Sequence, residues 1–468
     1  MIRLKEISAQ ICVLGGGPAG YAAAVRAAQL GATVALVEKD ELGGTCLNRG
    51  CIPTKALLHA AGVYRALTHM DESGLPPAEI SAPAGLEGIL ARKDETVRTL
   101  RAGLEQLMKK NGVTVVRGAG TARSPHLVEV GVGAEGCAVR CEKLIVAAGS
   151  EPLRPPIPGM ELAGVLTSDE ALVDPRLPQS VVIVGGGVIG LEFASFYRSL
   201  GCTVTVIELL DRLLPTQDTE VSAAVLRMLK KQGMKFHLGT KVLRFEQAGE
   251  KLRTVAEKDG TTSVVESGIV LVAVGRRLCG GSAALAPLGL ETERGSVCVD
   301  ARMRTSAEDV YAAGDVTGGP LLAHLAFAQA RIAAENAAGG SLTAGDLLVP
   351  ACIYTSPEIA SVGLSEQAAK EAGKDPLTGR FDLRANGRSL TLGNRDGFVK
   401  VVADRRTHKL LGACIVAPEA SEMISELTLA IRLGATADVL ADLIHPHPTL
   451  SEAIGEACGD ALGRALHK

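Results

Sequence analysis

The sequence is poor in aromatic residues, has no long apolar run and carries no block of charges of one sign. None of its 468 residues is tryptophan, 3% are aromatic, and the formal net charge is -3. Without a basic face, binding to nucleic acid or to an anionic membrane surface is not expected. No apolar stretch reaches the roughly 20 residues that span a bilayer, and residues 1–6 lead directly into an apolar strand without a secretion signal. We therefore expect a cytoplasmic protein whose partners are small molecules or other proteins.

Cysteine is the one reactive residue type that is abundant, with eleven copies. In a protein without a secretion signal these are expected to be thiols, and most lie in apolar runs that suit small buried side chains. Cys46 and Cys51 differ, because Gly43, Gly44 and Gly50 surround them. Residues five apart in an ideal helix have Cα atoms about 8 to 9 Å apart, which exceeds the disulfide limit of about 7 Å. A redox pair therefore requires a distorted turn, and the alternative is two unrelated buried thiols.

A glycine motif that occurs twice predicts two similar nucleotide-binding domains. A chain of this length is too long to fold around a single hydrophobic core, so more than one domain is expected. Short β-branched runs alternate with alanine-rich stretches, as in βαβ units. Gly15-Gly-Gly-Pro-Ala-Gly20 recurs 170 residues later as Gly185-Gly-Gly-Val-Ile-Gly190. We expect an α/β protein with two Rossmann-like dinucleotide-binding domains and a C-terminal α+β domain.

The domain boundaries follow from proline clusters and from the order of apolar segments. Four prolines between residues 152 and 158 mark one crossing, and the segment 310–315 resembles a return to the first domain. This predicts a discontinuous flavin domain (1–152 and 276–345), a nicotinamide-dinucleotide domain (153–275) and an interface domain (346–468). A helix from about Asp94 to Lys110 is expected to serve as a packed connector with one apolar face, formed by Val97, Leu100, Leu104, Leu107 and Met108.

Each glycine motif is followed, 23 residues after its first glycine, by an acid: Glu38 in the first copy and Glu208 in the second. The three glycines of such a motif allow a tight turn, an approach of the backbone to a pyrophosphate and close helix packing. They are Gly15, Gly17 and Gly20 in the first copy, and Gly185, Gly187 and Gly190 in the second. The acid accepts hydrogen bonds from ribose hydroxyls. Leu209 and Leu210 follow Glu208 in place of arginine, which favours NAD over NADP. The alternative is that both acids merely end strands in solvent.

The segment from Leu42 to Leu57 resembles the active-site segment of the class I pyridine nucleotide-disulfide oxidoreductases. Its Cys51-Ile-Pro-Thr-Lys55 ending is similar to the branch that oxidises dihydrolipoamide. The resemblance implies that Cys46 exchanges with the substrate and that Cys51 lies against the flavin of FAD. It also implies that Lys55 lies near the flavin N5 and pairs with Glu192. Alternatively, Lys55 and Glu192 are solvated helix charges.

Other segments resemble the cofactor-binding parts of the same family. Asp315 falls in the second flavin motif, where it would bind a ribityl hydroxyl. Further residues are implied to line the flavin: Gly44, Thr45, Gly120, Ala148, Gly149, Ser150, Leu321, Leu322, Ala323 and His324. Val242 and Gly275 fall where the family contacts NAD. One departure follows Gly275, where Arg276-Arg-Leu-Cys-Gly280 replaces the usual family pattern, so the local geometry on the NAD side is left open.

The C-terminal segment from His445 to Glu452 resembles the acid-base motif of the family. The resemblance implies that His447 takes the substrate proton and that Glu452 orients His447. Thr449 and Glu452 also fit a capping box, so Glu452 could instead be a helix cap. His445 has no assigned role.

The resemblance implies that the chain oxidises protein-bound dihydrolipoamide to lipoamide with NAD+, through Cys46, Cys51 and FAD. The expected partners are a lipoyl-bearing protein of a 2-oxoacid dehydrogenase or glycine-cleavage complex and a second copy of the chain. In that homodimer, His447 of one subunit would reach Cys46 of the other. No metal site is predicted. The alternatives are another NAD(P)H-dependent disulfide reductase and a catalytically idle flavoprotein subunit.

Overall fold

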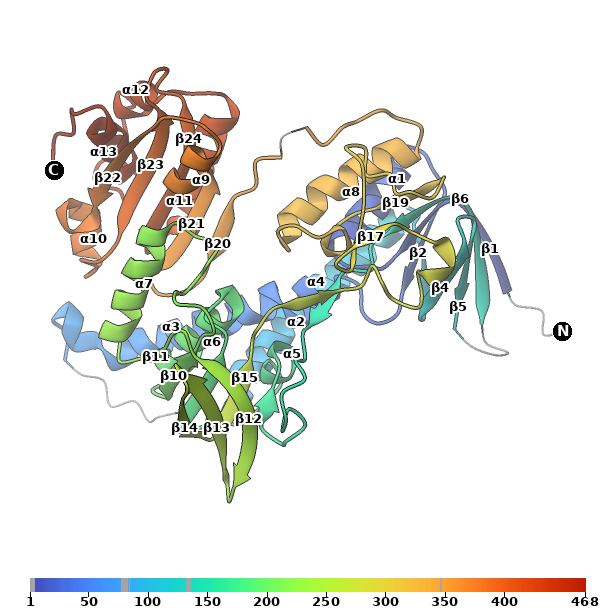
Figure 1. Cartoon of the computed structure of the whole chain (residues 1–468). Helices are drawn as coiled ribbons and strands as arrows, with labels where there is room; N and C mark the ends of the chain where they lie inside the picture. Colours follow the sequence, from blue (N-terminus) through green and yellow to red (C-terminus); the bar gives the residue numbers. More distant parts are fainter. Residues whose placement is uncertain (1–4, 77–82, 84, 132–135, 346) are drawn as a thin grey trace. The chain divides into compact units, whose positions relative to one another are not determined.

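A computed structural model describes residues 5–76, 83, 85–131, 136–345 and 347–468 (Figure 1). The chain divides into two compact units, each built from three separate stretches. The first unit comprises Met1–Ala56, Glu87–Leu153 and Gly275–Leu347. The second comprises Leu57–Leu86, Arg154–Val274 and Leu348–Lys468. The sequence predicts three domains, one for the flavin, one for the nicotinamide dinucleotide and one for the subunit interface. Their boundaries stay predictions.

The first unit is built around a seven-stranded sheet in the order β3-β2-β1-β6-β5-β4, with β19 also paired to β6. Its central strands β3, β2, β1, β6 and β19 are parallel, so β19 brings the chain back to the first sheet. The C-terminal end of β1 is buried on both faces, with Ile11 and Val13 in one core and Cys12 and Leu14 in the other. The strands are β1 (Lys5–Leu14), β2 (Val34–Glu38), β3 (Thr114–Arg117), β4 (Gly120–Ser124), β5 (Leu127–Val130), β6 (Cys137–Val146) and β19 (Val310–Ala312).

Alanine-rich helices cover one face of this sheet. α1 (Pro18–Gln29) buries a stripe of small residues, Ala19, Ala23, Ala24 and Ala27. It packs closely on α8 (Ala323–Ala337), and the two helices lie side by side in Figure 1. Small side chains allow this close approach. The starts of the two helices lie close together, because a Cβ atom on Gly314 would lie 2.8 Å from the Ala19 side chain and 3.5 Å from the Ala326 side chain.

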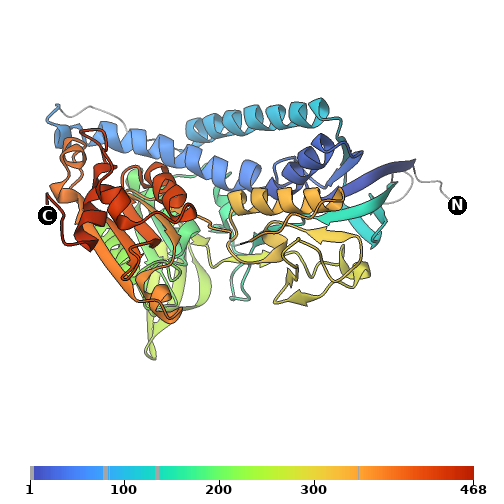
Figure 2. The same cartoon turned by 90° about the horizontal axis from the view of Figure 1, so that it is seen from above.

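The long helix α4 (Glu87–Lys110), light blue in Figure 2, begins seven residues before the helix that the sequence predicts. Val97, Leu104 and Met108 are buried, as expected. Leu100 and Leu107 are exposed, at 43% and 38%, so their placement on the packed face was wrong. The buried stripe follows positions 90, 97, 104 and 108, and residues at 100 and 107 lie on its flank.

The second unit contains a five-stranded parallel sheet in the order β11-β10-β9-β15-β8 and a three-stranded antiparallel sheet, β12-β13-β14. Two helices continue the Rossmann-like pattern: α6 (Val188–Ser199) follows β9, and α7 (Thr219–Lys231) is capped by the Asp218 carboxylate. The strands are β8 (Val165–Leu166), β9 (Ser180–Val184), β10 (Thr203–Ile207), β11 (Lys235–His237), β12 (Lys241–Ala248), β13 (Lys251–Lys258), β14 (Thr261–Ser267) and β15 (Ile269–Val272).

The C-terminal part of the second unit is an antiparallel five-stranded sheet in the order β20-β21-β24-β23-β22. α11 (Ala420–Arg432) and α13 (Glu452–Ala461) bury their apolar faces in its core. The other elements are β20 (Ala351–Ile353), β21 (Glu358–Gly363), β22 (Pro376–Asp382), β23 (Phe398–Asp404), β24 (Leu410–Ala417), α9 (Glu366–Glu371), α10 (Gly387–Thr391) and α12 (Ala437–Ala441).

The remaining α-helices and strands are α2 (Gly44–Arg49), the long helix α3 (Cys51–Thr68), α5 (Ser168–Ala171), β7 (Ser150–Pro152), β16 (Arg276–Leu278), β17 (Thr292–Glu293) and β18 (Ser296–Val297). The expected α/β class with a C-terminal α+β domain is confirmed. Within the described residues, no helix is long and apolar enough to cross a membrane.

Candidate active site

The first glycine-rich turn joins β1 to α1 and has a fixed shape. Gly15 has a φ of +107°, which glycine adopts without strain. A Cβ atom on Gly20 would overlap the carbonyl oxygen of Gly15, so α1 approaches the turn more closely than a larger residue permits. Gly17, the N-cap of α1, has no side-chain capping bond. The backbone amides at the start of α1 are therefore suited to binding a phosphate group.

Glu38, at the end of β2, forms hydrogen bonds both with this turn and with the segment that follows β2. Its Oε2 accepts a hydrogen bond from the Gly16 amide at 2.6 Å, and its Oε1 accepts one from the Asp40 amide at 2.7 Å. The residue is buried, so it does not end the strand in solvent. A carboxylate has about four acceptor positions, which leaves capacity for ribose hydroxyls.

The second turn repeats these contacts at the same offset of 170 residues. Gly185 has a φ of +112°, and a Cβ atom on Gly190 would overlap the Gly185 carbonyl oxygen. Gly187 faces open space and is the N-cap of α6, again without a side-chain cap. Glu208 accepts hydrogen bonds from the Gly186 amide at 2.5 Å and from the Leu210 amide at 2.8 Å. The two turns thus share their internal geometry, and both fit the pyrophosphate and ribose of a dinucleotide.

The two candidate redox cysteines lie on either side of a break between two helices. α2 contains Cys46 and ends at Arg49, Gly50 is neither helical nor extended, with φ −146° and ψ −116°, and α3 begins at Cys51. A Cβ atom on Gly50 would lie 2.8 Å from the carbonyl oxygen of Thr45. The distorted turn that the sequence predicts is therefore present, and it depends on the missing side chain of Gly50.

The two thiols interact with each other. A hydrogen bond with Cys51 and burial raise the pKa of the Cys46 thiol, and the nearby Lys55 ammonium opposes this rise. Cys51 is exposed. All eleven cysteines lie in the described part of the chain, and each is a thiol. The pair can therefore close to a disulfide by losing two protons and two electrons.

The cysteine helix also contacts the first dinucleotide turn. A Cβ atom on Gly44, at the start of α2, would lie 2.6 Å from the Cα atom of Gly17. Tyr21 of α1 also interacts with Cys46: burial, and to a smaller extent Cys46, raise the pKa of the Tyr21 phenol. A cofactor held at this turn would therefore lie beside the thiols.

Lys55 and Glu192 lie in different units, so their ion pair stays a prediction. Lys55 lies on α3, four residues after Cys51. Glu192 lies on α6, where it is buried, and its Oε1 accepts a hydrogen bond from the Tyr354 amide at 3.0 Å. The alternative that both are solvated helix charges does not hold. The Lys55 charge affects the pKa of Cys46, and Glu192 accepts a hydrogen bond from a backbone amide.

Arg276 links three parts of the first unit, and the sequence did not single it out. Its guanidinium donates to the Ser150 hydroxyl at 2.7 Å, to the Ser150 carbonyl at 2.8 Å and to the Thr45 hydroxyl at 3.4 Å. The Ser150 hydroxyl in turn donates to the Asp315 carboxylate at 2.5 Å. The residue before Cys46 and the expected ribityl ligand therefore belong to one hydrogen-bond network.

The remaining expected cofactor residues lie at strand ends, turns and helix starts. Ala148, Gly149 and Ser150 follow β6, and Leu321, Leu322, Ala323 and His324 lie at the start of α8. Gly120 in β4 is tightly packed, since a Cβ atom there would lie 2.7 Å from the Leu14 side chain. Val242 is buried in the core of the second unit, and Gly275 has a φ of +120°. Their contacts with FAD or NAD stay predictions.

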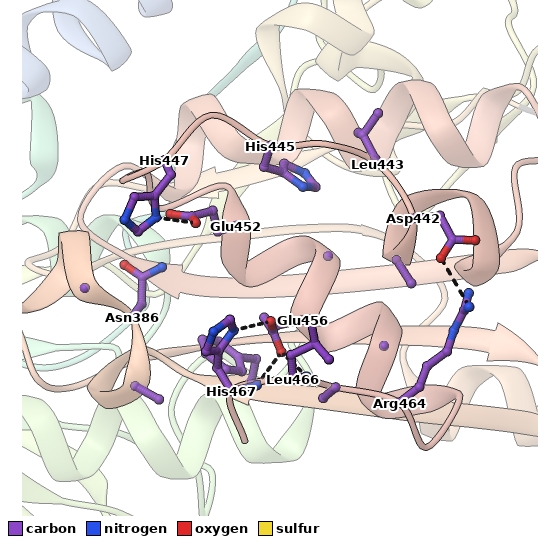
Figure 3. A pocket seen from close by; sticks show the side chains of 17 residues that line it. Asn386, Asp442, Leu443, His445, His447, Glu452, Glu456, Arg464, Leu466 and His467 are labelled. Atoms are coloured by element: carbon purple, nitrogen blue, oxygen red, sulfur yellow. Dashed lines mark hydrogen bonds and ion pairs between the residues drawn. The ribbon is translucent and has the colours of Figure 1, made fainter.

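His447 and Glu452 form a hydrogen-bonded pair in the C-terminal part of the second unit. His447 Nδ1 lies 2.8 Å from Glu452 Oε1, and the His447 side chain is 78% exposed (Figure 3). Partial burial raises the pKa of Glu452, but the Thr449 amide and His447 outweigh it, so the net shift is downward. The imidazole is thus oriented by a carboxylate and faces solvent, as an acid-base group requires.

Glu452 makes one of the two contacts that a capping box with Thr449 would require. Glu452 Oε2 does accept a hydrogen bond from the Thr449 amide at 2.7 Å. However, the Thr449 hydroxyl donates to the Pro446 carbonyl, and α13 begins only at Glu452. Glu452 therefore fixes the preceding loop and orients His447 at the same time. Asn386 supports this loop by donating to the Thr449 carbonyl at 3.0 Å.

A cavity of about 630 Å³ adjoins His447 and Glu452 (Figure 3). Its other walls include two further ionic pairs, His467 with Glu456 and Arg464 with Asp442. Within the described residues, no group of three or more His, Cys, Asp or Glu side chains is arranged to hold a metal ion. The cavity is therefore a polar recess beside an acid-base pair.

Family comparisons agree with this geometry. Residues 9–330 match the family described as pyridine nucleotide-disulphide oxidoreductase, and residues 349–458 match its dimerisation domain. The chain therefore belongs to the pyridine nucleotide-disulphide oxidoreductase family. It is 45% identical to the dihydrolipoyl dehydrogenase of Bacillus subtilis, over 98% of each chain. It is 42% identical to the dihydrolipoyl dehydrogenase of Halobacterium salinarum, over 98% of this chain and 97% of that protein.

Solved structures with the same architecture include LpdA from Mycobacterium tuberculosis, with a TM-score of 0.87 and 29% identity. A Cu(II) complex of the HOCl-induced flavoprotein disulfide reductase RclA from Escherichia coli also has a TM-score of 0.87, with 28% identity. Each alignment covers 97% of this chain and 99% of the other.

Family membership confirms the predicted class of enzyme, an oxidoreductase that acts on a dithiol or disulfide with FAD and NAD. The match to the dimerisation domain supports the expected homodimer. The roles of the individual site residues stay predictions.

Proposed function

We propose that this chain is a dihydrolipoamide dehydrogenase, which oxidises dihydrolipoamide to lipoamide with NAD+. The observation that carries the proposal is the thiol pair Cys46 and Cys51, whose helix packs against a dinucleotide turn through Gly44 and Gly17. The names of the relatives in Bacillus subtilis and Halobacterium salinarum support this choice of substrate.

In the proposed reaction the chain's own groups move protons and exchange disulfides. His447 removes a proton from a substrate thiol, and the resulting thiolate attacks the sulfur of Cys46 in the Cys46-Cys51 disulfide. This forms a mixed disulfide and releases Cys51 as a thiolate. The second substrate thiolate then displaces Cys46, so lipoamide leaves as a disulfide and the enzyme keeps a dithiol.

FAD, when bound, supplies the two-electron relay between the thiol pair and NAD+. We propose that the first glycine turn, Glu38 and Asp315 hold FAD. The second glycine turn and Glu208 would hold NAD+. Asp315 is positioned for this by Ser150 and Arg276.

We further propose that the substrate lipoyl group is carried by a protein of a 2-oxoacid dehydrogenase or glycine-cleavage complex, in the cytoplasm. The prevalence of thiols among the eleven cysteines agrees with a reducing compartment.

The test is a comparison of steady-state rates of the purified FAD-loaded protein with two substrate pairs. Dihydrolipoamide with NAD+ should be turned over much faster than glutathione disulfide with NADPH. The opposite preference would indicate another disulfide reductase, and no turnover of either pair would indicate an idle flavoprotein subunit.

A second experiment tests the acid-base role of His447 against a matched histidine. His447→Gln should lower kcat/KM for dihydrolipoamide by roughly 10²- to 10⁴-fold, the range that general acid-base catalysis provides. His467→Gln is the control, because His467 also binds a glutamate of α13, Glu456, at 2.7 Å. Equal losses in the two variants would argue against a special role for His447.

A further inference from the structure

His445 lies two residues before His447, and the structure shows a second histidine-glutamate pair there. His445 Nε2 lies 2.9 Å from Oε1 of Glu426 on α11, and the His445 side chain is only 8% exposed. The hydrogen bond with Glu426 raises the pKa of His445, with a smaller contribution from the Leu443 backbone, and this favours the charged imidazolium.

The His445 ring packs against the helix that carries Glu452. A Cβ atom on Gly455 would lie 3.3 Å from two atoms of this ring, so the glycine makes room for it. Gly455 follows Glu452 by three residues, which is about one turn of α13. The positive charge of His445 is also one of the causes that lower the pKa of Glu452, together with the Thr449 amide and His447.

The other charged groups around His445 have partners of their own. Glu456 binds His467 and Asp442 binds Arg464 on the walls of the same cavity. Cys458, which also faces Glu426, stays neutral, because burial and the Glu426 charge raise its pKa to about 12. Glu426 and Glu452 are thus the two carboxylates on which the charge of His445 acts.

We propose that His445 and Glu426 form a positioning pair that packs against α13 at Gly455 and so holds Glu452 in place to orient His447. The assignment rests on the proposed function, since it takes His447 and Glu452 as the acid-base groups. His445 and Glu426 themselves touch neither substrate nor cofactor in this role. They act through Glu452, since the His445 ring packs against Gly455, about one turn of α13 after Glu452.

The experiment uses FAD-loaded His445→Gln, Glu426→Gln and the double variant. His445→Gln removes the positive charge, so the pKa of Glu452 should rise. The acid limb of the kcat/KM profile for dihydrolipoamide should therefore move to higher pH. At neutral pH Glu452 is ionised in both proteins, so a loss there reflects only its poorer placement and should stay below about tenfold, well short of the effect of removing a general base. Glu426→Gln should act in the same direction, because His445 loses the carboxylate that keeps it charged.

The double variant separates this role from a purely structural one. It leaves no lone buried charge, so it should fold even where Glu426→Gln alone does not. Its pH profile should match that of His445→Gln, because Glu426 acts through His445. His467→Gln should keep the wild-type profile. A loss of rate with an unshifted acid limb would overturn the proposal.

A direct titration distinguishes a failure of this inference from a failure of the proposed function. The Glu452 carboxyl can be followed by 13C NMR without any substrate, with Glu452→Gln used to assign its signal. Its pKa should be higher in His445→Gln than in the wild type, and an unchanged pKa would overturn the positioning role. A wild-type protein that does not oxidise dihydrolipoamide would overturn the proposed function instead, and the titration would still decide the coupling of His445 to Glu452.

Discussion

Arg276 and Ser150 are joined by two hydrogen bonds, one to the serine hydroxyl at 2.7 Å and one to its carbonyl at 2.8 Å. The same guanidinium reaches Thr45, next to Cys46, and the serine hydroxyl reaches Asp315. One arginine therefore connects the cysteine helix with the segment expected to bind the flavin ribityl chain.

Loss of Arg276 should weaken FAD binding. Hydrogen bonds that involve a charged group contribute about 1.5 to 3 kcal/mol, so Arg276→Gln should raise the FAD dissociation constant about tenfold or more. Titration of the apoprotein, followed by flavin fluorescence, measures this. Arg277→Gln is the matched control, because Arg277 is exposed and binds only Glu151 among the described residues. An equal loss of affinity in both variants would mean that Arg276 has no special role.

Gly50→Ala should prevent the disulfide between Cys46 and Cys51. The added methyl group would lie 2.8 Å from the Thr45 carbonyl oxygen, so α2 and α3 would have to move apart. The wild-type protein as isolated should titrate with two fewer thiols under denaturing conditions than after reduction. The variant should show no such difference. Gly62→Ala on α3 is the control, since a Cβ atom there meets nothing within 4 Å, and it should retain the disulfide.

Lys400 should stabilise the second unit through three carboxylates. Its side chain is 5% exposed, and its ammonium lies 3.0 Å from Glu366, 3.3 Å from Asp218 and 3.4 Å from Glu220. Lys400→Met would leave these acids without their shared cation, at a cost of about 3 kcal/mol or more at neutral pH. Thermal unfolding should show a midpoint lower by roughly 5 °C. Lys370→Met, which removes only an exposed partner of Glu366, should change the midpoint little.

The pH dependence of this effect follows from Glu366 and Lys400. Hydrogen bonds from Lys370 and Lys400 lower the pKa of Glu366. Stability from that carboxylate is therefore present above its unfolded pKa of about 4.3 and is lost as the pH falls through the folded pKa. Burial lowers the pKa of Lys400, but its acidic partners outweigh burial, and the net shift is upward. The deficit of Lys400→Met should thus be largest between about pH 5 and pH 10 and should shrink at either extreme. A deficit independent of pH would contradict this origin.

A homodimer with shared sites should allow two inactive variants to complement each other. If His447 of one subunit serves Cys46 of its partner, a heterodimer of Cys46→Ser and His447→Gln contains one intact site and one site lacking both groups. Two-fold symmetry makes the two sites equivalent otherwise, so about half of the wild-type activity per dimer should return. Purified heterodimers as inactive as both parents would show that His447 acts within its own subunit or not at all.

The parts of the site that are local in the sequence were predictable from it. The glycine motifs and their acids, Glu38 and Glu208, lie at fixed distances within one βαβ unit. The break at Gly50 was predictable too, because two cysteines five residues apart cannot bridge within an ideal helix.

Contacts between distant segments were not predictable in the same way. Arg276 and Ser150 are separated by 126 residues, and Glu426 lies on α11 whereas His445 lies in the loop before α13. Nothing in a single sequence indicates which of its many arginines or glutamates meets a given partner. The buried face of α4 was misjudged for a related reason, because apolar periodicity gives a broad stripe and only packing decides which edge of it is covered.

Glu208 also has a consequence for any attempt to redesign the coenzyme preference. If Glu208 binds the ribose as proposed, its carboxylate would repel a 2′-phosphate, so replacing it is the obvious first step towards NADP. Yet the same carboxylate accepts hydrogen bonds from both the Gly186 amide and the Leu210 amide. Its removal would loosen the turn proposed to bind the pyrophosphate that both coenzymes share, and affinity for both coenzymes would fall together. A redesign would better begin at the exposed Leu209, where an arginine could be added while the acid that shapes the turn stays in place.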